Sequence, residues 1–210
     1  MRTKTLLLTA ALGAAGVASA IAQVYSVNAV GYVNLTAKAG FNLWNNPLDA
    51  KADGTVIKLL PGLPEGSIVY TYDGANFKLN TWELGEWTFP NDTLVPGQGF
   101  FLRVPAGSAD TTITFVGEVM QGTLSTPLIA GFNLVGSKVP QAGLIQTDLG
   151  FVPAEGDTVY KFDTATGNYA LSTFEFGAWD PAQPTLSVGE GIWVRKLAAG
   201  AWNRTFSVNP

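Results

Sequence analysis

Hydrophobic and polar residues alternate over short stretches along most of the chain, which is the period-two pattern of half-buried β-strands. Runs rich in β-branched and aromatic residues occupy 67–72, 77–84, 111–119, 158–162 and 169–176. Gly and Pro residues fall between runs spaced about 8–12 residues apart, which is typical of a β-sandwich or barrel. The pattern therefore predicts an all-β fold.

Helix is expected in only two places. Residues 55–60, with Asp53 as a candidate N-cap, and the corresponding residues 144–149 are each long enough for about a turn and a half. Segments this short cover a sheet and do not define an architecture.

The chain also repeats itself. Ala-Gly-Phe-Asn-Leu at 39–43 returns at 130–134, an offset of 91, and Gly97-Gln98-Gly99 returns as Gly189-Glu190-Gly191, an offset of 92. This self-similarity predicts two tandem homologous units of about 90 residues, 23–117 and 118–210, each sandwich-like or barrel-like with one short helix. Both Gly-x-Gly segments precede strands rather than helices, so they are interpreted as tight turns.

Three similar segments lie at the borders of these units, at 25–28, 115–118 and 206–209. One interpretation is that the middle strand serves both units. The other is that one border strand is unpaired and available for self-association by strand addition.

The N-terminus has the features of a secretory signal peptide, predicted for 1–22. Arg2 and Lys4 precede an uncharged apolar stretch over 6–22, and small residues allow cleavage after Ala20 or Ala22. A retained membrane anchor is the alternative, and no later segment is long and apolar enough to span a bilayer. We therefore expect a bacterial protein that is secreted, either extracellular or periplasmic.

Composition removes several classes of function. The chain has no Cys and no His, which excludes disulfides, thiolate nucleophiles, His-dependent triads and the usual zinc sites. Removal of Arg2 and Lys4 leaves 10 basic and 16 acidic residues, a net charge of −6, which argues against a nucleic-acid partner. No cofactor and no metal site are predicted, and the protein is expected not to be an enzyme.

The segment 24–34, Val-Tyr-Ser-Val-Asn-Ala-Val-Gly-Tyr-Val-Asn, directly follows the predicted signal peptide. With the paired Gly-Phe-Asn-Leu segments and the Gly-x-Gly-Phe/Ile-aromatic-x-Arg segments, it resembles an uncharacterised family of secreted verrucomicrobial-type proteins. The resemblance implies export and a β fold, and it implies no activity.

Repeated charged residues suggest a structural device. Glu83 recurs as Glu175, and Arg103 recurs as Arg195, so we predict ion pairs Glu83–Arg103 and Glu175–Arg195. A glycosidase would need two nearby carboxylates. The local pair Glu83 and Glu86 is not repeated, because Ala178 replaces the second member.

Tryptophans without a repeated Trp counterpart are freer to serve binding. Trp44, Trp82 and Trp202 meet this condition and are candidates for stacking on sugar rings, although large aromatic residues usually fill cores. Trp87 and Trp179 match each other and are assigned to packing.

The favoured hypothesis is therefore an exported, non-enzymatic structural or interaction protein of the cell surface or extracellular matrix. Its partners would be a polysaccharide or other envelope proteins. The alternative is a carbohydrate-binding module that uses exposed tryptophans. A small outer-membrane barrel is a third hypothesis, and the 12 prolines argue against it.

Overall fold

The computed structural model describes residues 29–208 and is built almost entirely of antiparallel strands, as the alternation predicts. The predicted signal peptide, its cleavage site and the border segment 25–28 lie outside the described residues. None of the described helices is long and apolar enough to cross a membrane.

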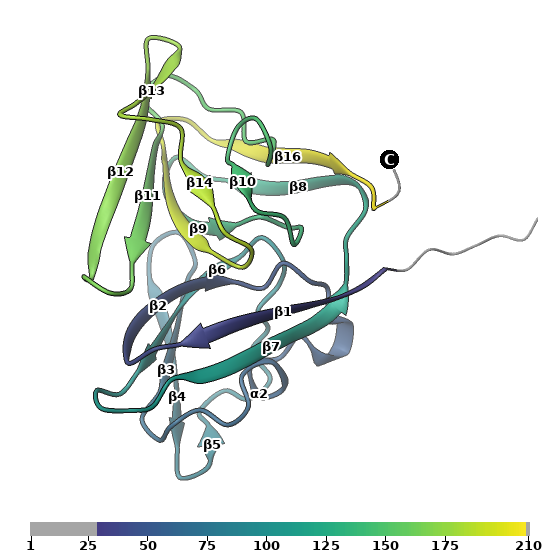
Figure 1. The fold of residues 1–210 in the computed structure, drawn as a ribbon, viewed down its shortest axis with the longest axis vertical. Helices are drawn as coiled ribbons and strands as arrows, with labels where there is room; N and C mark the ends of the chain where they lie inside the picture. The colour runs from purple at the N-terminus through teal and green to yellow at the C-terminus, as the bar shows by residue number, and fades with distance from the viewer. Residues whose placement is uncertain (1–28, 209–210) are drawn as a thin grey trace, which may run out of the picture.

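Two five-stranded sheets dominate the fold (Figure 1). The first has the order β2-β6-β3-β4-β5, with bounds Gly40–Asn45, Gly99–Val104, Ile68–Tyr72, Phe77–Glu83 and Glu86–Trp87. The second has the order β9-β15-β11-β12-β13, with bounds Gly131–Gly136, Gly191–Lys196, Thr158–Asp163, Asn168–Glu175 and Ala178–Asp180. We call residues 29–118 the N-terminal half and residues 122–208 the C-terminal half.

The two sheets match in order and register. Phe41 pairs with Arg103 in the first sheet, and Phe132 pairs with Arg195 in the second. This agreement is what a duplication predicts, although the common origin of the two units stays a prediction. The predicted unit boundary at 117–118 lies at the end of a strand.

A two-stranded ribbon faces each large sheet. In the N-terminal half β1 (Val30–Ala37) pairs with β7 (Thr111–Glu118), and in the C-terminal half β8 (Gly122–Leu128) pairs with β16 (Gly200–Phe206). The middle border strand is therefore not shared, because the chain makes separate strands β7 and β8 for the two halves. That interpretation was wrong.

The short elements also correct the sequence analysis. The first predicted helix exists as α2 (Val56–Leu59), preceded by the 3-10 turn η1 (Lys51–Asp53), but Thr55 and not Asp53 occupies the N-cap position. The second predicted helix was wrong. Leu144 belongs to strand β10 (Gly143–Leu144), which pairs with β14 (Thr185–Leu186). The residues that follow Leu144 form turns.

Each half has its own hydrophobic core between its sheet and its ribbon. In the N-terminal half Phe100 and Leu102 of β6 pack with Phe115 of β7. In the C-terminal half Ile192 and Val194 of β15 occupy the equivalent strand positions, and their core includes Trp202 of β16. Buried apolar surface in both layers is the main stabilising contribution of such a sandwich.

The repeated Gly-Phe-Asn-Leu segment has a clear structural reason in its asparagine. The Asn42 amide donates to the carbonyl oxygens of Lys38 (2.8 Å) and Leu102 (3.2 Å), and its Oδ1 accepts from the Lys38 amide (3.0 Å). Asn133 makes the same bonds to Ile129 and Val194. Each buried asparagine thus locks the preceding turn to the neighbouring strand, and its own polar groups are satisfied.

The repeated Gly-x-Gly segments do more than form turns, because they join the two halves. The amide of Asn45 donates to Gly189 (2.9 Å), and the amide of Gly136 donates to Gly97 (3.2 Å). A Cβ on Gly99 would lie 2.8 Å from the Val135 nitrogen, and one on Gly191 would lie 2.6 Å from the Trp44 oxygen. Only glycine allows the backbones of the two halves to approach this closely.

Candidate binding surface

The outer faces of the two large sheets, which point away from the cores, are rich in aromatic residues and pack against each other. Leu43, Phe101 and Leu134 are buried there in a third apolar cluster, together with the partly buried Tyr72, Phe162 and Trp193. The end of the β3–β4 hairpin reaches the C-terminal sheet, and the end of the β11–β12 hairpin reaches the N-terminal sheet. Tyr72 lies 5.0 Å from Trp193, and Phe162 lies 5.6 Å from Phe101, measured between ring centroids.

This crossing leaves two aromatic grooves that correspond to each other. One, of about 440 Å³, is formed on the N-terminal sheet and completed by the other half's hairpin. Its lining residues are Phe41, Tyr70, Phe77, Leu79, Phe101, Phe162 and Tyr169. The second, of about 420 Å³, is formed on the C-terminal sheet by Phe132, Tyr160, Tyr169, Trp193, Tyr72 and Phe77.

Phe77 and Tyr169 line both grooves, so the two form one continuous surface, which we call the aromatic trough. Its rings are substantially exposed, with 41% of Phe41, 46% of Phe77 and 43% of Phe132 accessible to solvent. The register of the sheets makes Phe41 the counterpart of Phe132, and Phe77 of Tyr169. Contiguous exposed apolar surface of this kind marks interaction sites on proteins.

No charged side chain lines either groove of the trough. Its polar atoms are chiefly tyrosine hydroxyls. Burial raises the pKa of the Tyr169 phenol, and the adjacent Trp193 indole opposes this shift in part. The surface therefore suits flat or apolar groups.

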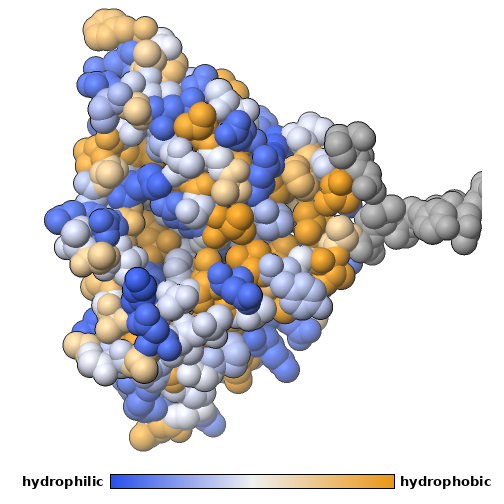
Figure 2. Space-filling view, in the orientation of Figure 1, coloured by the Kyte–Doolittle hydropathy of each residue, from blue (hydrophilic) through white to orange (hydrophobic). Residues whose placement is uncertain are grey.

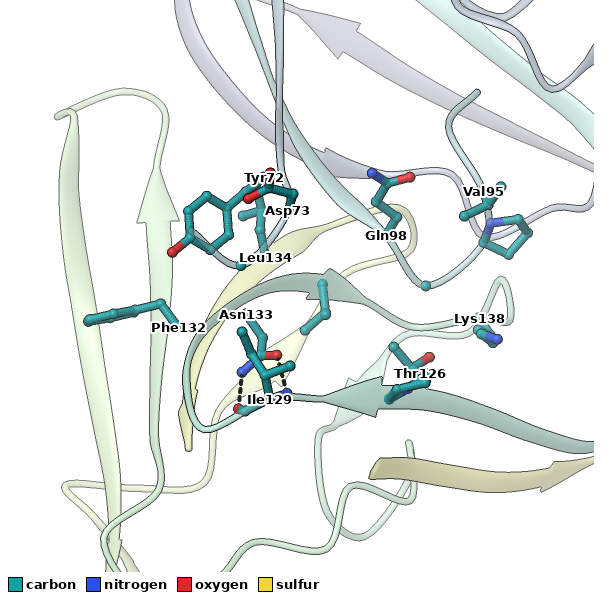
Figure 3. Close-up of a pocket in the computed structure, with 15 residues that line it drawn as sticks. Tyr72, Asp73, Val95, Gln98, Thr126, Ile129, Phe132, Asn133, Leu134 and Lys138 are labelled. Atoms are coloured by element: carbon teal, nitrogen blue, oxygen red, sulfur yellow. Dashed lines mark hydrogen bonds between the residues drawn. The ribbon is translucent and has the colours of Figure 1, made fainter. Parts of the chain in front are cut away.

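A more polar pocket of about 310 Å³ adjoins the part of the trough that lies on the C-terminal sheet (Figure 3). It shares Tyr72 and Phe132 with the trough, and Gln98 and Lys138 lie on its opposite side. The Lys138 ammonium donates to the Ser125 carbonyl oxygen (2.6 Å). This pocket combines an aromatic wall with hydrogen-bonding groups.

The tryptophans proposed from sequence do not form this surface. Trp44 and Trp202 are buried, with 7% and 5% of their surface exposed, so their assignment as ligand-stacking residues was wrong. Trp44 packs edge-on against Phe100, and the Trp202 indole donates to the Leu149 oxygen (2.8 Å). Each fills a core, as large aromatic residues commonly do.

Trp82 is half-buried and packs against the N-terminal core, with its ring 5.6 Å from that of Trp87. It lies on the inner face of its sheet and does not reach the trough. Trp87 is buried and Trp179 is partly buried, which confirms their assignment to packing.

The predicted ion pairs Glu83–Arg103 and Glu175–Arg195 were also wrong. Among residues 29–208, the salt bridges involve other side chains. Arg103 is in register with Thr81 across β3, so Glu83 is displaced by two positions as well as by an intervening strand. The C-terminal half has the same displacement between Arg195 and Glu175.

The repeated glutamates that do act on the hairpins are Glu65 and Glu155. Glu155 accepts from the amides of Phe176 and Gly177 (both 2.8 Å), and Glu65 accepts from the amide of Leu84. Leu84 and Phe176 have positive φ angles of 55° and 53°, which are unusual for such residues. The carboxylates therefore hold two strained hairpin turns.

Those turns carry the most exposed apolar side chains, with Leu84 96% and Phe176 98% accessible. The β4–β5 and β12–β13 hairpins lie at opposite ends of the molecule in Figure 1, and Figure 2 shows apolar residues at the upper end. They are separate from the trough.

A metal centre is not evident in the part of the chain that the structure describes, since no group of three or more acidic side chains is gathered there. The trough itself was missed by the sequence reasoning. A signal was present, because Tyr70 and Tyr72 alternate with the core residue Val69, so both faces of the strand are apolar. Strands that are apolar on both faces are covered on both.

Comparison with protein-family models, with curated proteins and with solved structures gave no match for this chain. The resemblance to secreted verrucomicrobial-type proteins therefore stays a prediction.

Proposed function

We propose that this protein is an exported, non-enzymatic interaction protein of the cell surface or extracellular matrix, and that its contact surface is the aromatic trough. The observation that supports this proposal is the continuity of exposed rings from Phe41 through Phe77 and Tyr169 to Phe132. The partner is an envelope or matrix component that presents flat apolar faces.

Energetics favour a binding role for this surface. Leaving about half of several large aromatic side chains in water forgoes stabilisation of roughly 25 cal/mol for each Å² left unburied. Aromatic side chains are also the residues that most often dominate the energy of protein interfaces.

The carbohydrate-binding alternative no longer rests on Trp44 and Trp202, because both are buried. Self-association through the border strands is a separate prediction, and each ribbon strand pairs with one other strand. Sedimentation velocity of the mature chain tests it, since strand addition would give dimers or longer assemblies.

Co-sedimentation tests the proposed function. The chain from Gln23 is mixed with the insoluble envelope and matrix fraction of the cells that produce it, and bound protein is measured in the pellet. We expect the wild type to sediment and the double variant Phe77→Ser/Tyr169→Ser to remain soluble, because these two residues lie at the centre of the trough.

A matched control replaces exposed apolar residues outside the trough. Leu84→Asn/Phe176→Asn removes two side chains at the hairpin turns, and asparagine tolerates the left-handed backbone there. This control should sediment like the wild type. Equal binding by the folded trough variant would overturn the proposal.

A further inference from the structure

The pocket of Figure 3 differs from the adjoining trough in having polar side chains with unused hydrogen-bonding capacity. Gln98 is half-buried, and its side-chain amide makes no hydrogen bond to another residue within 29–208. An amide of this type offers two donors and an acceptor. The Lys138 ammonium uses one of its three donors on Ser125.

The opposite wall of the pocket is aromatic. The Phe132 ring lies 6.0 Å from Trp193 in an edge-on arrangement and 5.6 Å from Tyr160, which fixes its orientation. The residue is 43% exposed, so part of the ring is accessible to a ligand. Tyr72 extends this wall toward the Asp73 turn.

The N-terminal half has the aromatic residue but not the polar pocket. Glu190, the counterpart of Gln98, is engaged by Lys161 (3.2 Å) and by the Ser187 amide (2.7 Å). Leu35 side-chain atoms lie 3.0 Å from a Cβ on Gly189, whereas Thr126 and Lys138 surround the equivalent Gly97. The side chains beside this glycine are therefore apolar at Gly189 and polar at Gly97, and Gln98 has no ion-pair partner like that of Glu190.

We infer that the pocket of Figure 3 is a saccharide subsite, in which one pyranose ring of an oligosaccharide lies against Phe132 and the sugar units next to it reach Gln98, Thr126 and Lys138. A pyranose has an apolar C–H face and a rim of hydroxyls, and this pocket offers the complement of both. Its volume of about 310 Å³ is at the small end of the range for ligand sites, roughly 300–1,000 Å³. The inference rests on the proposed function and specifies the ligand of one end of the trough.

Titration of the mature chain with soluble β-1,4-linked hexasaccharides tests the inference. The probes are the hexamers of glucose, of N-acetylglucosamine and of mannuronic acid, followed by intrinsic tryptophan fluorescence and by calorimetry. Trp193 lies beside Phe132 and should report occupancy. We expect saturable binding of at least one hexamer, weakened about tenfold or more by Phe132→Ala, the factor equivalent to 1.4 kcal/mol.

The symmetry of the fold supplies the control. Phe41→Ala removes a ring of nearly equal exposure, with equivalent neighbours at 5.8 Å and 5.9 Å, but from the half without the polar pocket. The affinity loss of Phe41→Ala should be clearly smaller than that of Phe132→Ala, and Gln98→Ala should weaken binding. Lys138→Met should weaken the mannuronate hexamer most if an acidic sugar is the ligand.

Absence of saturable binding to all three hexamers would overturn the inference, as would equal losses for Phe41→Ala and Phe132→Ala or an unchanged affinity for Gln98→Ala. These results are distinct from failure of the proposed function. Co-sedimentation that depends on Phe77 and Tyr169 but is accompanied by no saccharide binding would refute the subsite alone.

Discussion

The two halves of the molecule place different chemistry at one equivalent buried position. Ser67 and Asp157 occupy equivalent positions. The Ser67 backbone oxygen accepts a hydrogen bond from the Trp82 amide (2.8 Å), and the Asp157 backbone oxygen accepts one from the Phe174 amide (2.9 Å). Val104 and Lys196 correspond as well, since they pair with Gly40 and Gly131.

The N-terminal half uses neutral groups there, and the C-terminal half uses an ion pair. The Ser67 hydroxyl donates to the Pro64 oxygen (2.7 Å) beside the buried Val104. In the C-terminal half, Lys196 donates to Asp157, whose same carboxylate oxygen accepts from the Ala154 amide (2.7 Å). The side chains of Lys196 and Asp157 are only 8% and 1% exposed.

The fold therefore does not require the ion pair. Desolvation of two charges costs several kcal/mol, and their attraction offsets that cost only in good geometry. Here the other Asp157 oxygen, Oδ1, is buried without a hydrogen-bond partner in the described chain. The neutral pair of the N-terminal half solves the same packing problem without that penalty.

Breaking the ion pair should have the largest effect. Asp157→Ala leaves the Lys196 charge buried and unpaired, and we expect a loss of about 3–5 kcal/mol in the free energy of unfolding. Ser67→Ala, the matched change, should lose about 1 kcal/mol because it removes one neutral hydrogen bond. Urea unfolding monitored by circular dichroism measures both, and equal losses would contradict the comparison.

Transplanting the neutral pair should restore or improve stability. The double variant Asp157→Ser/Lys196→Val copies the N-terminal half and removes both charges together. Replacement of buried ion pairs by neutral residues of suitable shape is often neutral or stabilising by about 1–4 kcal/mol. We expect the double variant to unfold at the wild-type urea concentration or above; a loss as large as that of Asp157→Ala would show that the ion pair has a specific role.

Gly99 and Gly191, at which the backbones of the two halves approach closely, should contribute equally to stability. Gly99→Ala and Gly191→Ala each place a Cβ within 2.8 Å of backbone in the opposite half, so the halves must separate locally. We expect each to lower stability by about 1–3 kcal/mol, as overpacking commonly does. Gly200→Ala is the control, because its nearest neighbour would lie 3.8 Å away; thermal unfolding that is unchanged in only one of the two variants would break the equivalence.

The smallest expected effect concerns Tyr169, which stands where the N-terminal half has Phe77. Burial raises the pKa of the Tyr169 phenol in the folded state above its ordinary value of 10.0. As the pH rises above 10, the unfolded chain ionises first, so the folded wild type loses stability that Tyr169→Phe retains. Urea midpoints at pH 8 and pH 11 measure this, and identical pH dependence of the two proteins would count against it.

The comparison also shows which features of the sequence were informative. The alternating runs predicted the strands well, since β3, β4, β7, β11 and β12 each lie within one residue of the predicted bounds. The repeated asparagine and Gly-x-Gly segments marked real structural constraints, although the sequence suggested only turns for the latter. The prediction of a helix over 144–149 was wrong because Leu144 pairs with Thr185 of β14, which is distant in the sequence.

The predicted ion pairs failed for a related reason. Alternation places Glu83 and Arg103 on the same outer face of the sheet, but it does not give strand order or register. Strand β3 lies between their strands, and the register displaces them further. Because the same residues recur in both halves, both ion pairs were predicted on the same grounds, and both predictions were wrong.

The sequence was sufficient to predict the all-β character, the positions of five strands and the equivalence of Asn42 and Asn133. These are consequences of local alternation and of turn residues, which act over a few positions of the chain. What covers each face depends on the tertiary structure. It buried Trp44 and Trp202 in separate cores and brought the aromatic outer faces together as a trough. A side-chain pattern specifies that a face is apolar, whereas its cover depends on contacts between segments distant in the chain.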